Sequence, residues 1–399
     1  MKNGWVFMSE SWHYGILSDS EEAKRLNEIL SQCFLIPLDQ CASYIDILQP
    51  ENYRLVRQDH QIGGGLVMVS TGHWLGGQLV DCMGVSAVGI APECRGTGAA
   101  KTLLGNLLRE LYDQGIPLSS LYPATPPLYR KLGYEQAASR CLWEVPLLTL
   151  TPQKPQLPCI RVENCTEAIA PLYEQYAPRH NGAVQRGDFL WYLIWRGFIP
   201  VDPPPVYTYL FGDRSAPEGY IVFCQTRGQE SSMEIRDRVL LTPAAVQSFW
   251  AFLYSHRSQM TSASWHGPQL DATMLTLPLD TMVPTEQMML SWRIVHLEAA
   301  LEQRGYPCLS GELHLEIEDE ILPENCDRVL LTLKDGKPQV TRGGRGELRL
   351  NIRHLAPLYS GLWSASQLHH LGYIEGTPEA IALANVLFAG DLPGLSDFF

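Results

Sequence analysis

One stretch of this chain, Gly84–Glu110, constrains its fold more than any other. It joins a short apolar run, Val85–Ile90, to a turn with two glycines, Arg95–Gly98, and then to a leucine-rich segment that ends near Leu111. The apolar run predicts a buried strand, and the leucine spacing predicts a helix. A helix that starts near Gly98 presents unpaired N–H groups and partial positive charge to the turn, and glycines let a ligand approach the backbone. The stretch therefore predicts an anion site suited to phosphate or pyrophosphate.

The residues around the two glycines distinguish between phosphate-binding motifs. A P-loop needs a Lys-Ser/Thr pair after its last glycine, but Ala99 and Ala100 follow Gly98 here. A dinucleotide-binding fingerprint needs a third glycine where Lys101 stands. The turn instead resembles the acyl-CoA motif of the GCN5-related N-acetyltransferases, Arg/Gln-x-x-Gly-x-Gly/Ala, with Arg95, Gly98 and Ala100 at its fixed positions. The alternative is an ordinary strand-turn-helix unit in which the glycines only form the turn.

The balance of charged residues narrows the possible partners. Lys and Arg number 30 against 43 Asp and Glu, which gives a formal net charge of −13. Such a charge argues against nucleic acid or an anionic membrane surface as a partner, and it suits a cationic substrate. The alternative is that the charge only keeps the chain soluble.

Other patterns argue against membrane insertion, export and metal binding. No apolar run approaches the roughly 20 residues of a membrane helix, and residues 1–15 lack the apolar core of a signal peptide. We therefore expect a cytoplasmic protein. The 10 cysteines include no CxxC pair and the 11 histidines no HExxH motif, so we expect neither a metal site nor a disulfide framework.

The order of the predicted elements indicates three domains in the 399 residues. Spaced prolines at 152–158 mark a linker, beyond which the order of helices and strands is close to that of the first unit. Nothing like the turn at 95–100 appears there, so we expect a second copy of the fold without a cofactor site. We also expect one long strand over Leu79–Ile90, and a helix that includes Trp292 and Leu301 at the start of the third unit. The expected domains are residues 1–149, 150–285 and 286–399.

Three further segments make the family resemblance more specific. They are Leu128–Glu135 (LYRKLGYE), Ser291–Pro307 (SWRIVHLEAALEQRGYP) and the aromatic terminus Ser396–Phe399 (SDFF). In this order and spacing they resemble the Eis (enhanced intracellular survival) family of N-acetyltransferases over nearly the whole chain. The resemblance implies an α+β fold with two GCN5-related acetyltransferase-like domains, the second degenerate, and a C-terminal domain similar to sterol carrier protein 2. It also implies a homohexamer that uses acetyl-CoA, and no metal, to acetylate aminoglycosides or other polycationic amines.

The resemblance assigns roles to individual residues. Tyr129 matches the family's general acid, and the α-carboxylate of Phe399 matches its general base. The strand that binds the pantetheine arm of acetyl-CoA corresponds to Val88, Gly89 and Ile90. The pyrophosphate cradle corresponds to Arg95, Gly96, Gly98, Ala99 and Ala100. We place Tyr44 and Phe398 in the amine pocket, where Phe398 stands in place of an acid that a family member can carry and so removes a negative charge.

Acyl transfer to an amine can use these groups without a covalent enzyme intermediate. An α-carboxylate with a pKa of about 3.3–3.7 is a weak base, but it can accept a proton as the amine attacks, and its charge holds the cation. A tyrosine hydroxyl can protonate the leaving thiolate, whose thiol has a pKa of about 8.5 if it behaves like cysteine. Backbone N–H groups of the strand before the turn can polarise the thioester carbonyl.

Two other functions remain open on the sequence alone. A non-catalytic acyl-CoA-binding or lipid-binding protein would keep the glycine turn and need neither the acid nor the base. An acetyltransferase acting on protein lysines would have a flatter, more open cleft. Tyr44, Tyr129 and Phe399 can also be core aromatics without a chemical role, because tyrosine and phenylalanine often serve only as packing residues.

Overall fold

The chain forms two compact α+β units in the computed structural model. The structure describes residues 12–59, 61–197, 204–227, 231–278 and 281–399. The first unit comprises Met1–Ser70 and Met83–Gly115, and the second comprises Thr71–Cys82 and Ile116–Phe399. None of the helices within the described ranges is long and apolar enough to cross a membrane.

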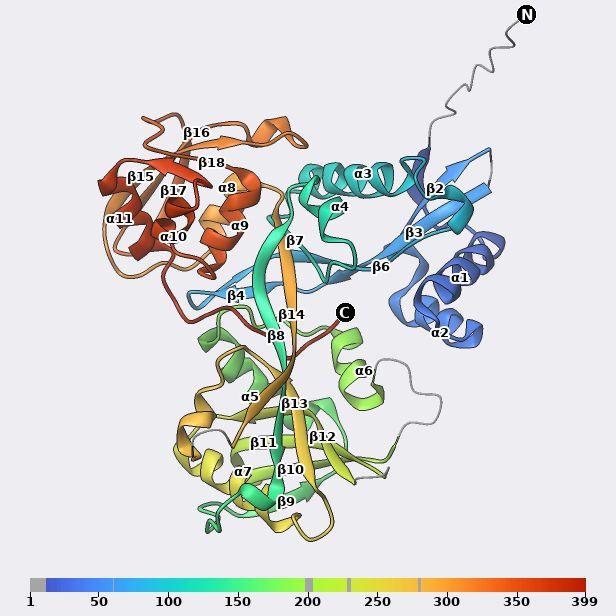
Figure 1. Cartoon of the computed structure of the whole chain (residues 1–399), viewed down its shortest axis with the longest axis vertical. Helices are drawn as coiled ribbons and strands as arrows, with labels where there is room; N and C mark the ends of the chain where they lie inside the picture. Colours follow the sequence, from blue (N-terminus) through green and yellow to red (C-terminus); the bar gives the residue numbers. More distant parts are fainter. Residues whose placement is uncertain (1–11, 60, 198–203, 228–230, 279–280) are drawn as a thin grey trace, which may run out of the picture. The chain divides into compact units, whose positions relative to one another are not determined.

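The first unit is an antiparallel sheet with helices on both faces, and its strands pair in the order β1-β2-β3-β6. Its elements are β1 (His13–Ile16), α1 (Ser20–Phe34), α2 (Leu38–Leu48), β2 (Tyr53–Gln58), β3 (Gln61–Ser70), β6 (Cys82–Ile90) and α3 (Ala99–Asp113). Neighbouring residues of β2 point to opposite faces, as the pleat requires. The Arg54 side chain forms an ion pair with Glu110 of α3, whereas Leu55 lies beside Leu26 of α1 over Gly65. Helix α3 therefore covers one face of this sheet and α1 the other (Figure 1).

The larger sheet of the second unit has the strand order β7-β14-β8-β13-β12-β11-β10-β9 and is antiparallel except for the pair β12–β13. Its elements are β7 (Leu118–Leu121), α4 (Pro126–Arg130), β8 (Glu135–Pro146), β9 (Cys159–Val162), α5 (Thr166–Tyr176), α6 (Asp188–Arg196), β10 (Val206–Asp213), β11 (Ala216–Thr226), β12 (Ser232–Leu240), α7 (Pro243–Ser255), β13 (Ser262–Gly267) and β14 (Val283–Ile294). The long strands β8 and β14 run side by side (Figure 1). A short hairpin of β4 (His73–Leu75) and β5 (Gln78–Val80) also belongs to this unit.

Strand β11 separates two hydrophobic cores. Tyr220 and Val222 pack with residues of α5 and α6, and Ile221 and Phe223 pack with residues of α7. This alternation is the two-residue period of a strand that is buried on both faces. The central part of the second unit is therefore a sheet covered by helices on both sides, as in the first unit.

The C-terminal part of the second unit contains a five-stranded sheet with the order β17-β16-β15-β18-β19. Its elements are α8 (Leu297–Gln303), β15 (Gly311–Glu318), β16 (Asp327–Lys334), β17 (Lys337–Arg342), β18 (Leu348–Asn351), α9 (Ile352–Ser360), α10 (Ala365–His370), β19 (Ile374–Gly376) and α11 (Pro378–Leu387). On β16 the buried residues Val329, Leu331 and Leu333 alternate with more exposed ones, as the sequence predicts for a strand with one face on a core.

Two secondary-structure predictions are wrong. The expected single strand over Leu79–Ile90 is divided, because residues up to Val80 belong to the hairpin strand β5 and β6 begins at Cys82. Trp292 lies in β14, and the helix begins only at Leu297. The run Leu290–Val295 is buried throughout, and a fully buried strand has no periodicity that separates it from a buried helix.

Candidate functional site

The glycine turn of the first unit has the geometry that a phosphate group requires. Gly96 and Gly98 have φ angles of 78° and 95°, in the left-handed region that favours glycine. Gly98 is the N-cap of α3 and offers no side chain to the first N–H groups of this helix. At the start of α3 the Thr102 N–H donates to the Gly98 carbonyl oxygen at 3.0 Å. The N–H groups of residues 99–101 precede this bond, so they have no partner within the helix and face the turn. Among the residues that the structure describes, no atom would lie within 4 Å of a Cβ at either glycine, so no described side chain fills the space over the turn.

Side chains around the turn hold its shape. The Thr97 hydroxyl donates to the Cys94 carbonyl oxygen at 2.7 Å and accepts from the indole N–H of Trp12 at 3.2 Å. The exposed Arg95 donates from Nε to the Ile90 carbonyl oxygen at 3.3 Å. Arg95 thus brings a positive charge next to the helix start, where it adds to the helix dipole. The turn therefore fits the pyrophosphate of a nucleotide cofactor such as acetyl-CoA.

The strand before the turn carries a β-bulge that sequence reasoning did not predict. Ala87 has a φ angle of 50°, and the register between β3 and β6 shifts between Gly65 and Val67. A bulge leaves one residue outside the ladder and frees its backbone groups. It lies directly before Val88, Gly89 and Ile90, the residues expected to bind the pantetheine arm. A backbone kink there is consistent with hydrogen bonding to a ligand laid along β6.

Replacement of Gly98 by alanine should weaken acetyl-CoA binding about tenfold, because a left-handed residue with a Cβ costs roughly 1–3 kcal/mol and the turn will relax away from that geometry. Calorimetric titration with CoA measures the effect. Gly105→Ala is the matched control, since Gly105 lies inside α3, has an ordinary φ and also has no atom of a described residue within 4 Å of an added Cβ. An unchanged CoA affinity in Gly98→Ala would remove the turn from the cofactor site.

Tyr129 lies on α4 in the second unit and is only 7% exposed. Its ring contacts Tyr134 edge-on, with 6.0 Å between centroids. The two hydroxyls differ: that of Tyr134 forms a 2.8 Å hydrogen bond with the Ser119 hydroxyl, whereas no described residue pairs with that of Tyr129. Burial raises the pKa of Tyr129 to about 12, so its hydroxyl keeps its proton at neutral pH. Tyr129 is thus a protonated donor without a competing internal acceptor among the described residues.

The last residues are built into the second unit. Phe399 is 3% exposed, and Tyr122 of the loop after β7 contacts the rings of both Phe398 and Phe399, with centroid distances of 4.8 and 5.9 Å. The guanidinium of Arg140 on β8 lies 5.4 Å from the centre of the Phe398 ring. No hydrogen bond or ring contact within the described ranges joins Tyr129 to Phe399. Tyr44 is half-buried on α2 of the first unit, and its place in an amine pocket stays a prediction.

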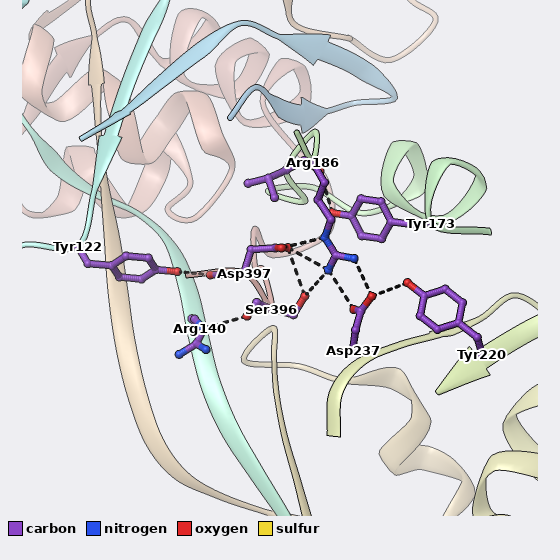
Figure 2. Close-up of polar contacts among 9 residues, drawn as sticks. Tyr122, Arg140, Tyr173, Arg186, Tyr220, Asp237, Ser396 and Asp397 are labelled. Carbon is purple, nitrogen blue, oxygen red and sulfur yellow. Dashed lines mark hydrogen bonds and ion pairs between the residues drawn. The ribbon is translucent and has the colours of Figure 1, made fainter. Parts of the chain in front are cut away.

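Sequence reasoning missed a buried ion cluster that surrounds Asp397 (Figure 2). The Arg186 guanidinium lies between the carboxylates of Asp397 and Asp237, and all three side chains are 5% exposed or less. Tyr220 donates a hydrogen bond to Asp237. The one sequence signal for this cluster is an acidic residue at the centre of an otherwise apolar terminus, while Arg186 and Asp237 lie in unremarkable segments. No group of three His, Cys, Asp or Glu side chains suited to a metal is found among the residues that the structure describes.

Three family models match the chain. Two describe an acetyltransferase (GNAT) domain and cover residues 17–137 and 182–294, and the third describes a sterol carrier protein domain and covers residues 297–396. The predicted fold class, two acetyltransferase-like domains followed by a sterol-carrier-like domain, is therefore confirmed.

Proteins that are named as N-acetyltransferases match most of the chain. A GCN5-related N-acetyltransferase from Anabaena variabilis, known from a crystal structure, is 40% identical and superposes with a TM-score of 0.94 over 98% of this chain and 100% of its own. An uncharacterized N-acetyltransferase from Streptomyces griseus is 26% identical over 349 residues, which are 82% of this chain and 83% of the relative. N-acetyltransferase Eis from Mycobacterium tuberculosis is 24% identical over 331 residues, 78% of each protein.

Proposed function

This chain belongs to the Eis-like GCN5-related N-acetyltransferases, and we propose that it moves the acetyl group of acetyl-CoA to an amine of a cationic small molecule, such as an aminoglycoside or a polyamine. The reaction is a direct attack of the amine, with Tyr129 as general acid and the α-carboxylate of Phe399 as general base. The homohexamer and the cytoplasmic location implied by the resemblance stay predictions, as do the domain limits 1–149, 150–285 and 286–399.

The observation that carries this proposal is the fixed, buried position of the last residues. Chain ends are usually frayed and exposed, so a terminus that is held by ring contacts and by the ion pair between Arg186 and Asp397 is consistent with a role for its carboxylate. A buried carboxylate attracts an ammonium group strongly, because the surrounding protein screens charge less than water does. The net charge of −13 adds a weaker, long-range attraction for cations.

Each group of residues has a separate task in the proposed reaction. In the first unit, Arg95 and the amides at the start of α3 hold the cofactor's phosphates, and the backbone of Val88–Ile90 orients its arm. Bound acetyl-CoA supplies the activated acetyl group as a thioester. In the second unit, the Phe399 carboxylate takes a proton from the attacking amine, directly or through one water, and Tyr129 donates a proton to the departing sulfur.

The first test is thiol release from acetyl-CoA in the presence of spermidine, kanamycin, lysine and a lysine-containing peptide. We expect turnover with the first two amines, because they carry several positive charges on a small framework. Turnover with the peptide alone would favour the protein acetyltransferase. Binding of acetyl-CoA without turnover of any amine would contradict the proposal and favour the binding protein.

Replacement of Tyr129 by phenylalanine should lower kcat about 10²-fold, near the low end of the general-acid range, because a thiolate is already a fair leaving group. The affinity for acetyl-CoA should not change. Tyr134→Phe is the matched control, since it removes a hydroxyl from the neighbouring ring that is bonded to Ser119. Because burial raises the pKa of Tyr129 to about 12, activity should show no alkaline loss from this group near pH 10. Equal kcat values in the two variants would remove Tyr129 from the mechanism.

A further inference from the structure

The main chain before Asp397 is fixed against strand β8. The Ser139 N–H donates to the Pro393 carbonyl oxygen at 3.1 Å, and the Leu395 N–H donates to the Ser139 carbonyl oxygen at 3.1 Å. The Gly394 N–H donates to the Asn181 carbonyl oxygen at 2.9 Å, and a Cβ atom at Gly394 would lie 2.4 Å from the Cβ of Pro268. Residues 393–399, which we call the tail, thus begin with a short parallel bridge to β8. Position 394 accommodates only a glycine, because a side chain there would collide with Pro268.

Both edges of the Arg186 guanidinium are used by carboxylates (Figure 2). Toward the tail, Nε donates to Asp397 Oδ1 at 2.8 Å and one terminal nitrogen donates to Oδ2 at 3.2 Å. Toward β12, the two terminal nitrogens donate to the Asp237 carboxylate at 2.7 and 3.0 Å. Paired hydrogen bonds of this kind fix direction as well as distance. The position of Asp397 is therefore set by a strand of the central sheet.

The faces of the same guanidinium are also covered. Its carbon lies 3.7 Å from the centre of the Tyr173 ring and 4.9 Å from that of Trp191. The Tyr173 hydroxyl is occupied by the Val184 carbonyl oxygen at 2.7 Å, so this ring has one orientation. Arg186 therefore has no freedom to follow a moving tail.

The backbone of Asp397 is held by a second set of contacts from the other side. The Tyr122 hydroxyl donates to the Asp397 carbonyl oxygen at 2.9 Å, and Arg140 Nε donates to the Ser396 carbonyl oxygen at 2.9 Å. Only two residues separate this anchored point from the terminal carboxylate. Two extended residues reach about 7 Å, so release of Asp397 lets the carboxylate move by several ångströms.

The cluster of Arg186, Asp237 and Asp397 is not explained by a contribution to the stability of the fold alone. It buries two carboxylates with one guanidinium, and apolar residues of similar volume often stabilise a core as well as or better than a buried ion pair. Such groups are better suited to specifying one arrangement of the chain.

We propose that Arg186 is a positioning residue that holds the Phe399 carboxylate in place through Asp397. The second acetyltransferase-like domain, matched at residues 182–294, would then have a function of its own, which is to hold the C-terminal residues in place. This inference rests on the proposed role of the Phe399 carboxylate. A displacement of a catalytic group by about 1 Å can lower the rate on the order of 10²-fold. A tail that is held less firmly should therefore lower kcat and leave the affinity for CoA nearly unchanged.

The test compares Arg186→Met and Asp397→Asn, each in the ordinary chain and in a chain whose Phe399 carboxylate is converted to an amide. Asp397→Asn keeps the Arg186–Asp237 pair and weakens only the link to the tail. We expect kcat to fall about 10–100-fold in Arg186→Met and about tenfold in Asp397→Asn, with CoA affinity within twofold of the wild type. In the amidated chain neither substitution should lower kcat further, because the group that they position is absent.

Arg238→Met is the matched control. Arg238 follows Asp237 on β12, points to the other face, forms a buried ion pair with Asp271 and stacks on Trp265, but it does not contact the tail. Its replacement also removes an arginine from a buried ion pair, so it controls for a loss of stability, and it should leave kcat unchanged. Wild-type kcat in Asp397→Asn and in folded Arg186→Met, or an undiminished loss in the amidated chain, would overturn the inference. If amidation itself has no effect, the proposed base fails instead. If Arg186→Met does not fold, Asp397→Asn decides the question.

Discussion

Conversion of the Phe399 α-carboxylate to an amide should lower kcat for amine acetylation by about 10²–10⁴-fold, the usual contribution of a positioned acid or base. The amide keeps the phenylalanine ring, which contacts Tyr122 at a tilt of 57° in a residue that is 3% exposed, so the packing of the last residues is retained. Only the negative charge and the proton-accepting capacity are lost. The affinity for acetyl-CoA should stay the same, because the change leaves the glycine turn and Arg95 as they are.

The control is a chain assembled by the same ligation of a C-terminal peptide with a free carboxylate. A chain extended by one glycine is a second probe, because it keeps the charge and moves it by about 3.5 Å. We expect the extended chain to lose activity to a similar degree, since the charge is no longer where the amine attacks. If the kcat of the amidated enzyme lies within twofold of that of the ligated enzyme with a free carboxylate, the proton is taken by water or by another group.

The local part of the site could be predicted from the sequence, because short-range rules govern it. The glycine spacing at Gly96 and Gly98 requires a turn with positive φ angles, and the leucine pattern that follows places the start of α3 next to it. The bulge at Ala87 had no such signal, since alanine rarely adopts a positive φ and only the register of β3 against β6 imposes it.

The ion cluster that holds Asp397 could not be predicted, because its residues come together only in the folded chain. Arg186 is 51 residues from Asp237 and 211 residues from Asp397. Each lies in a segment whose local pattern is satisfied without the others. The resemblance to a family indicated that the terminus matters, and the contacts of Asp397 indicate how it is held.

Replacement of Arg293 by methionine should lower the free energy of unfolding by about 3–5 kcal/mol, because it leaves a buried carboxylate without its partner. Arg293 on β14 donates to both oxygens of Asp319, at 2.7 and 2.6 Å, and the two side chains are 0% and 1% exposed. Asp319 also accepts hydrogen bonds from the Leu322 N–H and the Asn325 side chain, so it cannot turn toward solvent without breaking the loop after β15. Gly133 packs directly on the guanidinium, where a Cβ atom would lie 2.8 Å from Nε. The melting temperature should therefore fall by roughly 10 °C, measured by differential scanning calorimetry at one fixed protein concentration.

Arg328→Met, on β16 of the same unit, is the matched control for this loss. Arg328 pairs with Glu316 at 3.0 Å, but their side chains are 54% and 30% exposed, so solvent screens the pair and its removal should cost less than about 1 kcal/mol. Both variants remove one arginine from an arginine–carboxylate pair. The difference between their melting temperatures therefore measures the effect of burying the pair. Equal melting temperatures in Arg293→Met and Arg328→Met would mean that the Asp319 carboxylate is stabilised by its backbone and amide donors alone, and that the guanidinium adds nothing to the fold.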